Sequence, residues 1–189
     1  MHSTKKGLAL GCCLALLLCF FASPLLAGEV EPEVGTVLGP VTFAAPMSAA
    51  DATYLGLDSA RPFTLKDVKS PYVLVEQFNT SCPHCMHEAP FLNQLFDRVQ
   101  QDPALKGKLK FMAVAQSGDT GPVMAWKAMQ KVPFPILPDP NSTLGKALNF
   151  TPYPVTMLVD NKTGKIVWVQ IGAFDDVDEV FQGIKAAAK

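Results

Sequence analysis

Short runs of β-branched and aromatic residues, bounded by turn-forming residues, predict the strands of this chain. The run over 72–78 is apolar except for Glu76 and Gln77, so we expect a central strand buried on both faces. The last two runs flank an Asn-Lys-Thr-Gly turn and predict a hairpin. The predicted strands cover residues 41–43, 72–78, 109–115, 155–160 and 165–171, with a further extended piece at 63–65.

Apolar residues at intervals of three and four predict the helices. Ser48 and Asp51 resemble a capping box at the start of the first helix, and Pro90 is expected to kink the second. The order of elements predicts an α/β sandwich in which helices flank a mixed sheet. The predicted helices cover residues 48–57, 83–101, 122–131, 141–149 and 175–189.

The N-terminal leader, residues 1–27, differs from the rest of the chain. Lys5 and Lys6 are followed by a long apolar run without a charge, which predicts a secretory signal peptide cleaved before Gly28. The alternative is an uncleaved membrane anchor, since the run is long enough to span a bilayer. In both cases residues 28–189 lie in the periplasm or another extracytoplasmic space, either free or tethered to the inner membrane.

Length and charge restrict the choice of function. A chain of 189 residues, 49% of them hydrophobic, suits one compact domain after the leader. The Pro- and Gly-rich stretch 28–45 predicts a linker or N-terminal extension, and 46–189 the folded domain. A net charge of -1 gives no electrostatic reason to expect nucleic acid as a partner.

The cysteines point to chemistry. Three of the five lie in the leader, where they are small apolar residues, so the exported domain keeps Cys82 and Cys85. A disulfide between them would close too short a loop to stabilise the fold much. A thiolate at a helix start is favoured by free backbone N–H groups and the helix dipole. We therefore expect an exposed Cys82 to attack as the nucleophile and Cys85 to resolve the mixed disulfide.

Two further side chains are candidates for tuning this pair. His84, if protonated, would stabilise the Cys82 thiolate and make the disulfide a stronger oxidant; otherwise it is a plain surface histidine. Glu76, in an otherwise apolar strand, would exchange a proton with Cys85 if it is buried. The alternative places the Glu76 carboxylate at the strand end, hydrated and inert.

Two prolines precede the strand at 155–160. A cis proline here would form a tight turn and leave backbone groups free to pair with an extended peptide. Alternatively, Pro152 and Pro154 are both trans and only end a loop between a helix and a strand.

With these motifs, residues 40–189 resemble the thioredoxin superfamily. The resemblance implies a three-layer sandwich, a buried carboxylate at Glu76, and a cis proline at Pro154 rather than Pro152. It also implies that the backbone of Tyr153 pairs with substrate. The segment between the cysteines and the prolines resembles the TlpA-like and peroxiredoxin-like branch, in which a helix is inserted into the basic fold.

The resemblance points to both directions of electron flow. The motif Cys82-Pro83-His84-Cys85 resembles the oxidising DsbA type, whereas the surrounding chain resembles reductases of cytochrome c maturation. We expect a thiol–disulfide oxidoreductase acting on cysteine-containing exported proteins, with the reducing direction favoured and a DsbA-like disulfide oxidase as the alternative. It would need an unidentified redox partner, but no cofactor and no metal.

Three other functions fit the sequence less well. A peroxidase of the peroxiredoxin type would carry a Thr and a Pro where this chain has Asn79 and Val75. A metal-delivery module could hold Cu(I) between Cys82 and Cys85, but a structural zinc site would need a second ligand pair. A pure interaction domain of this fold would contain no thiol of unusual reactivity.

Overall fold

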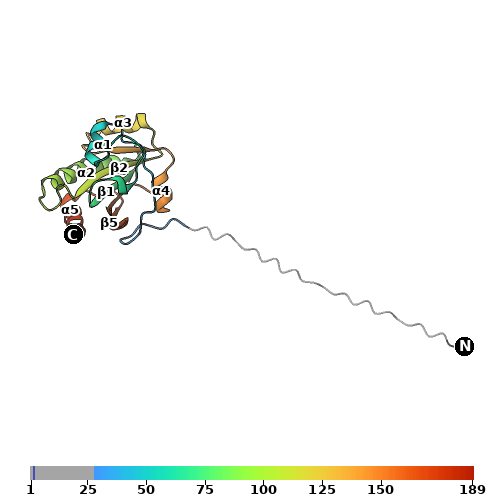
Figure 1. Cartoon of the computed structure of the whole chain (residues 1–189). Helices are drawn as coiled ribbons and strands as arrows, with labels where there is room; N and C mark the ends of the chain where they lie inside the picture. The colour runs from blue at the N-terminus through green and yellow to red at the C-terminus, as the bar shows by residue number, and fades with distance from the viewer. Residues whose placement is uncertain (1, 3–27) are drawn as a thin grey trace.

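The computed structural model describes His2 and residues 28–189, which form an α/β fold with one sheet between layers of helix and loop (Figure 1). The predicted leader lies outside the described residues apart from His2. Nowhere in the described part of the chain is a helix both long and apolar enough to cross a membrane. The strands are β1 (Tyr72–Phe78), β2 (Leu109–Gln116), β3 (Ile136–Asp139), β4 (Val155–Asp160) and β5 (Lys165–Ile171). The helices are α1 (Ala49–Leu55), η1 (Leu65–Asp67, a 3-10 turn), α2 (Pro83–Gln101), α3 (Thr120–Met129), α4 (Thr143–Leu148) and α5 (Val177–Ala187).

The sheet has the strand order β3-β2-β1-β4-β5. Strands β1, β2 and β3 are parallel, whereas β4 runs antiparallel to both β1 and β5. Every residue of β1 after Tyr72 is buried, because neighbouring strands flank β1 on both sides and apolar layers cover both of its faces. The mixed sheet and the central position of β1 confirm the sequence prediction.

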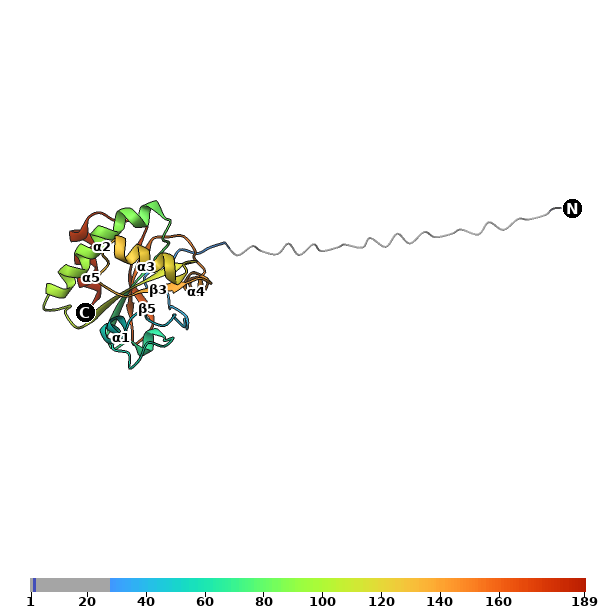
Figure 2. The same ribbon diagram turned by 90° about the horizontal axis from the view of Figure 1, so that it is seen from above.

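Two apolar cores enclose the sheet, one on each face. On one face, Leu74 and Phe78 of β1 pack under α2, α3 and α5, and the ring centroids of Phe78 and Trp126 are 4.4 Å apart. On the other face, Val73 and Val75 pack against the N-terminal segment, α1 and α4. Figure 2 shows α2, α3 and α5 on one side of the sheet and α1 on the other.

The structure differs from the sequence prediction mainly between residues 130 and 150. Strand β3 is absent from the sequence prediction because prolines interrupt its sequence. It is short and lies at the edge of the sheet, where Pro138 removes no hydrogen bond between central strands. Helix α4 is capped by the carboxylate of Asp139, which accepts the backbone N–H groups of Thr143 (2.8 Å) and Leu144 (3.0 Å). Helix α2 includes Pro90 without a break, and the kink expected there stays a prediction.

The predicted strand at 41–43 is reduced to a single bridge between Phe43 and Phe63. Sheet pairing by the N-terminal segment occurs instead at residues 35–38. There, the N–H of Ile166 donates to Thr36 (2.8 Å) and the N–H of Leu38 donates to Gly164 (2.8 Å). The segment therefore covers the start of the edge strand β5, where backbone groups would otherwise be unpaired.

The other sheet edge is completed by a side chain. Strand β3 pairs with β2 only from Ala113 onward, so the N–H of Phe111 has no strand partner on that side. The hydroxyl of Tyr54 in α1 accepts this N–H at 2.9 Å. Burial raises the pKa of Tyr54 to about 12, so the hydroxyl stays neutral, and the ring lies 4.5 Å from the Lys110 ammonium.

Replacing Tyr54 with Phe should lower the free energy of unfolding by about 1–3 kcal/mol, because the Phe111 N–H loses its acceptor while the ring stays in place. Urea denaturation measures the change. Tyr72→Phe is the matched control, since its hydroxyl bonds only the terminal Lys189 carbonyl (2.7 Å) and should cost less than about 0.5 kcal/mol. Equal losses in both variants would contradict a specific role for Tyr54.

Candidate active site

Cys82 lies at the junction of the central strand and the longest helix. It is the N-cap residue of α2, with extended backbone angles (φ -81°, ψ 118°), and its Sγ accepts the N–H of Cys85 at 3.2 Å. Pro83 occupies the first helical turn, where the missing N–H costs nothing. A thiolate on Cys82 would therefore face the positive end of the helix dipole, as the sequence predicted.

The exposure of Cys82 is lower than expected. Both cysteines are free thiols, and the exposed fraction is 6% for Cys82 and 0% for Cys85. The prediction of an exposed Cys82 is therefore wrong for this conformation. The reason is that its Sγ turns back along the first helical turn toward the Cys85 N–H instead of projecting into solvent.

Cys85 is held as a neutral thiol. Burial raises the pKa of Cys85 far above its usual range, and the hydrogen bond with Cys82 and the charges of Cys82 and Glu76 add to the rise. Its sulfur therefore needs a proton acceptor before it can attack.

Glu76 lies inside the domain beneath the cysteines. It is buried on β1, opposite Ala113 of β2 and Thr156 of β4, which excludes the hydrated strand-end alternative. Burial raises the pKa of Glu76 well above the ordinary carboxyl value, and neither of its oxygens has a hydrogen-bond partner among the described residues.

A second buried carboxyl group was missed by the sequence prediction. Glu88 of α2 is 0% exposed; burial and the charge of Glu76 both raise its pKa, with Cys82 adding to the rise. The Thr156 hydroxyl and the Phe174 backbone moderate this rise, although no described group reaches the Glu88 oxygens with full hydrogen-bond geometry.

The helical spacing contained the signal for Glu88. The buried residues of α2 recur at intervals of three and four, and Glu88 falls within that stripe. A carboxyl group at a core position of the helix, one turn after Cys85, could have been recognised as a second buried acid.

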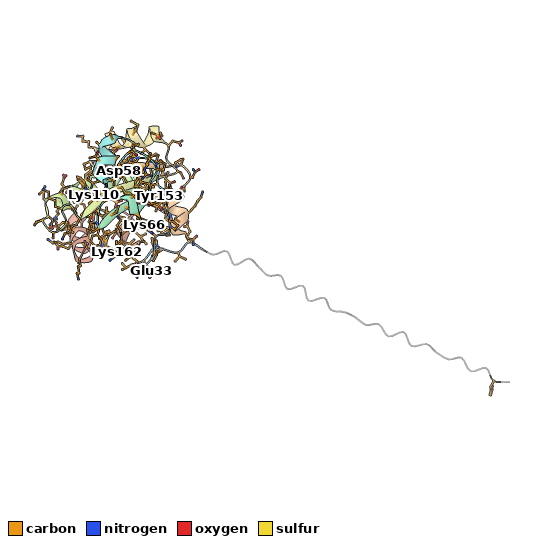
Figure 3. All side chains as sticks on the ribbon, in the orientation of Figure 1. Glu33, Asp58, Lys66, Lys110, Tyr153 and Lys162 are labelled. Atoms are coloured by element: carbon orange, nitrogen blue, oxygen red, sulfur yellow. The ribbon has the colours of Figure 1, made fainter. Side chains whose placement is uncertain are left out.

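One of the two prolines before β4 follows a cis peptide bond, as the first of the two predictions for this segment required. The Tyr153–Pro154 peptide bond is cis, whereas the bond before Pro152 is not. Pro154 is buried and Tyr153, labelled in Figure 3, is 39% exposed. Because Gln77 pairs with Val155, Pro154 lies at the end of β1 from which the chain leads to Cys82. We call residues 149–154 the cis-proline loop.

The histidines lie on the outside of the same helix end. His84 is exposed in the first turn of α2, between the two cysteines. His87 is also exposed, and its ring lies 5.4 Å from that of Phe91. The structure thus brings together Cys82, Cys85, Glu76 and Glu88, with His84 and the cis-proline loop at the rim.

Solved structures of several bacterial proteins have a similar fold. A Chlorobium tepidum protein designated thiol:disulfide interchange protein DsbE gives a TM-score of 0.65 at 18% identity, covering 84% of this chain and 100% of its own. The thioredoxin domain of a Bacteroides vulgatus thiol-disulfide oxidoreductase gives a TM-score of 0.63 at 16% identity, covering 84% of this chain and 100% of its own. StoA from Bacillus subtilis gives a TM-score of 0.57 at 18% identity, covering 77% of this chain and 98% of its own. No curated protein sequence matches this chain significantly.

The sequence itself matches the family model described as Redoxin over residues 45–184. This match covers well over half of the chain and includes both motif cysteines, Glu76, Glu88 and Pro154. The chain therefore belongs to the Redoxin family, and its fold is thioredoxin-like, as the resemblance implied.

Proposed function

We propose that this protein is an exported thiol–disulfide oxidoreductase that reduces disulfides in other exported proteins. The observation that carries the proposal is the Cys82 sulfur at the N-cap of α2, bonded to the N–H of the buried Cys85. The similarity to a thiol:disulfide interchange protein supports this chemistry. The apolar leader supports export, followed by either cleavage or anchoring.

The first step is attack by Cys82. Its thiolate forms a bond to one sulfur of the client disulfide, the client S–S bond breaks, and the other client sulfur leaves as a thiolate that takes up a proton. The helix N-terminus stabilises the attacking charge. The product is a mixed disulfide between Cys82 and the client.

The second step is resolution by Cys85. Its thiol loses a proton and attacks the Cys82 sulfur; the second client thiolate leaves and is protonated. The client has then gained two electrons and two protons, and the protein holds a Cys82–Cys85 disulfide. A dithiol partner must return the two electrons, and the sequence does not identify it.

The buried carboxyl groups suit the proton transfer in the second step. The charge of Glu76 contributes to the raised pKa of Cys85, so the two groups interact. We assign the ionised form of Glu76, populated as the pH approaches its raised pKa, as the group that accepts the Cys85 proton, with Glu88 next to it. The client backbone would lie along Tyr153 and Pro154, whose loop ends beside β1.

A disulfide oxidase of the DsbA type is the second candidate, and the exposed His84 between the cysteines favours it. A positive charge at His84 would stabilise the thiolate and hence the reduced protein. The two directions differ in reduction potential, which is about -270 mV for thioredoxin and about -120 mV for DsbA.

Mutation of each cysteine should have a different effect. Cys82→Ser should lower insulin disulfide reduction at least about 1,000-fold, because the nucleophile is lost. Cys85→Ser should instead accumulate a mixed disulfide with a peptide client, visible by mass spectrometry and released by dithiothreitol. Retained insulin reduction by Cys82→Ser would overturn the assigned mechanism.

Replacing Glu76 with Gln should slow resolution of the mixed disulfide about 100-fold, because Cys85 loses its proton acceptor. Glu76→Gln should also stabilise the fold above about pH 4.5, which is the ordinary pKa of a glutamate side chain. Above pH 4.5, Glu76 ionises in the unfolded state but keeps its proton in the folded state. The wild type therefore loses stability as the pH rises, until the pH passes the raised pKa of folded Glu76.

Stopped-flow kinetics and urea denaturation between pH 4 and 9 measure both effects of Glu76→Gln. Glu31→Gln, an exposed change in the N-terminal segment, is the control and should alter neither. A variant that is slower but also less stable at neutral pH would show that Glu76 acts only through packing.

The reduction potential, measured against glutathione or dithiothreitol, should lie closer to -270 mV than to -120 mV. His84→Ser should make it still more negative, because a group that can carry positive charge beside the thiolate is removed. A wild-type value near -120 mV would instead favour the oxidase.

A further inference from the structure

Two buried side-chain amides face the cis-proline loop from inside the domain. Gln77 of β1 and Gln116 at the end of β2 are 0% and 7% exposed. Both lie on the sheet face opposite Glu76, because side chains alternate along a strand. Buried glutamines are uncommon, and the proposed exchange chemistry uses neither of these.

The amides bind three successive carbonyl groups of the loop. Gln77 Nε2 donates to the carbonyls of Phe150 (3.2 Å) and Pro152 (2.9 Å). Gln116 Nε2 donates to the carbonyl of Thr151 (2.9 Å). The loop belongs to no strand or helix over these residues, so the two side chains replace the donors that regular structure would supply.

The same glutamine connects the loop to the nucleophile. The backbone carbonyl of Gln116 accepts Asn79 Nδ2 at 2.8 Å, and Asn79 Oδ1 accepts the N–H of Ser81 at 2.9 Å. Ser81 directly precedes Cys82. A chain of three hydrogen bonds therefore runs from Ser81 through Asn79 and Gln116 to Thr151.

The surroundings leave Gln116 little freedom. A Cβ atom added to Gly145 of α4 would lie 2.8 Å from Gln116 Oε1, so helix α4 packs closely against the amide. On its outer side the loop is held as well, because the Glu29 carboxylate accepts both the N–H (3.1 Å) and the hydroxyl of Thr151. The loop is thus held from both sides.

We propose that Gln77 and Gln116 are positioning residues that fix the cis-proline loop relative to the Cys82 sulfur and thereby set the affinity for extended peptide clients. The inference rests on the proposed function, because it assumes that a client lies along Tyr153. A client strand gains affinity only if the loop already has the binding geometry, since ordering it on binding would cost free energy.

A purely structural role predicts something different. If the amides only stabilised the fold, their loss would lower the unfolding free energy but leave the selectivity of the folded protein unchanged. If they position the loop, the loss must affect peptide clients more than small disulfides, which reach Cys82 without the loop.

The test uses Gln77→Met and Gln116→Met, which keep the side-chain length but remove the donor. Each reduced variant is mixed in a single turnover with rising concentrations of a disulfide-linked peptide and, separately, of 2-hydroxyethyl disulfide, so that KM is the half-saturating concentration and kcat the limiting rate. We expect KM for the peptide to rise at least about tenfold with kcat within about twofold, since one or two buried carbonyls lose their donor. The rate with the small disulfide should stay within about twofold of wild type.

Gln182→Met, on the exposed face of α5, is the control and should match the wild type with both substrates. Equal slowing with both substrates, or unchanged KM for the peptide in both buried variants, would overturn the proposal. The small-disulfide rate also reports the folded fraction of each sample, so partial misfolding cannot imitate the expected result. A wild type that does not prefer the peptide over the small disulfide would contradict the proposed function instead.

Discussion

The burial of β1 on both faces is the constraint on which the rest of the site depends. Neighbouring strands satisfy the backbone of β1, and apolar cores cover both of its faces, so any polar side chain on it must find a partner or lose its charge. Burial raises the pKa of Glu76 and so disfavours its charged form, whereas Gln77 finds partners in the cis-proline loop. Because adjacent residues point to opposite faces, the proposed function gives these two consecutive side chains different tasks: proton transfer on one face and support of client binding on the other.

The two buried carboxyl groups act as one unit because the ionisation of one affects the pKa of the other. The charge of Glu76 raises the pKa of Glu88, so ionisation of one disfavours ionisation of the other. Among the described residues no lysine, arginine or histidine is buried that could compensate a second negative charge. The pair is therefore suited to hold one negative charge at most. It can take up a single proton from Cys85 and release it once the disulfide has formed.

The sequence predicted the parts of the site that break a local pattern. Cys82 and Cys85 stand out by their spacing at a helix start, and Glu76 by its charge in an apolar strand. Glu88 was missed because a glutamate in an amphipathic helix breaks no pattern until the buried stripe is known. Strand β3 was missed for the opposite reason, since its prolines obscure a strand that the sheet edge tolerates. The low exposure of Cys82 depends on one side-chain rotation toward the Cys85 N–H, which no sequence pattern encodes.

The same arrangement bears on the direction of electron flow. A protein of this kind is a strong oxidant when its reduced form is stabilised, which requires a well-stabilised thiolate. Here the described contacts give the Cys82 sulfur one backbone donor, and two carboxyl groups without a buried cation lie behind it. Any negative charge that reaches Glu76 or Glu88 opposes a thiolate at Cys82, while exposed His84 acts through solvent, where its charge is screened. The proposed reducing direction therefore requires that the buried acids outweigh the histidine, despite the Cys-Pro-His-Cys sequence.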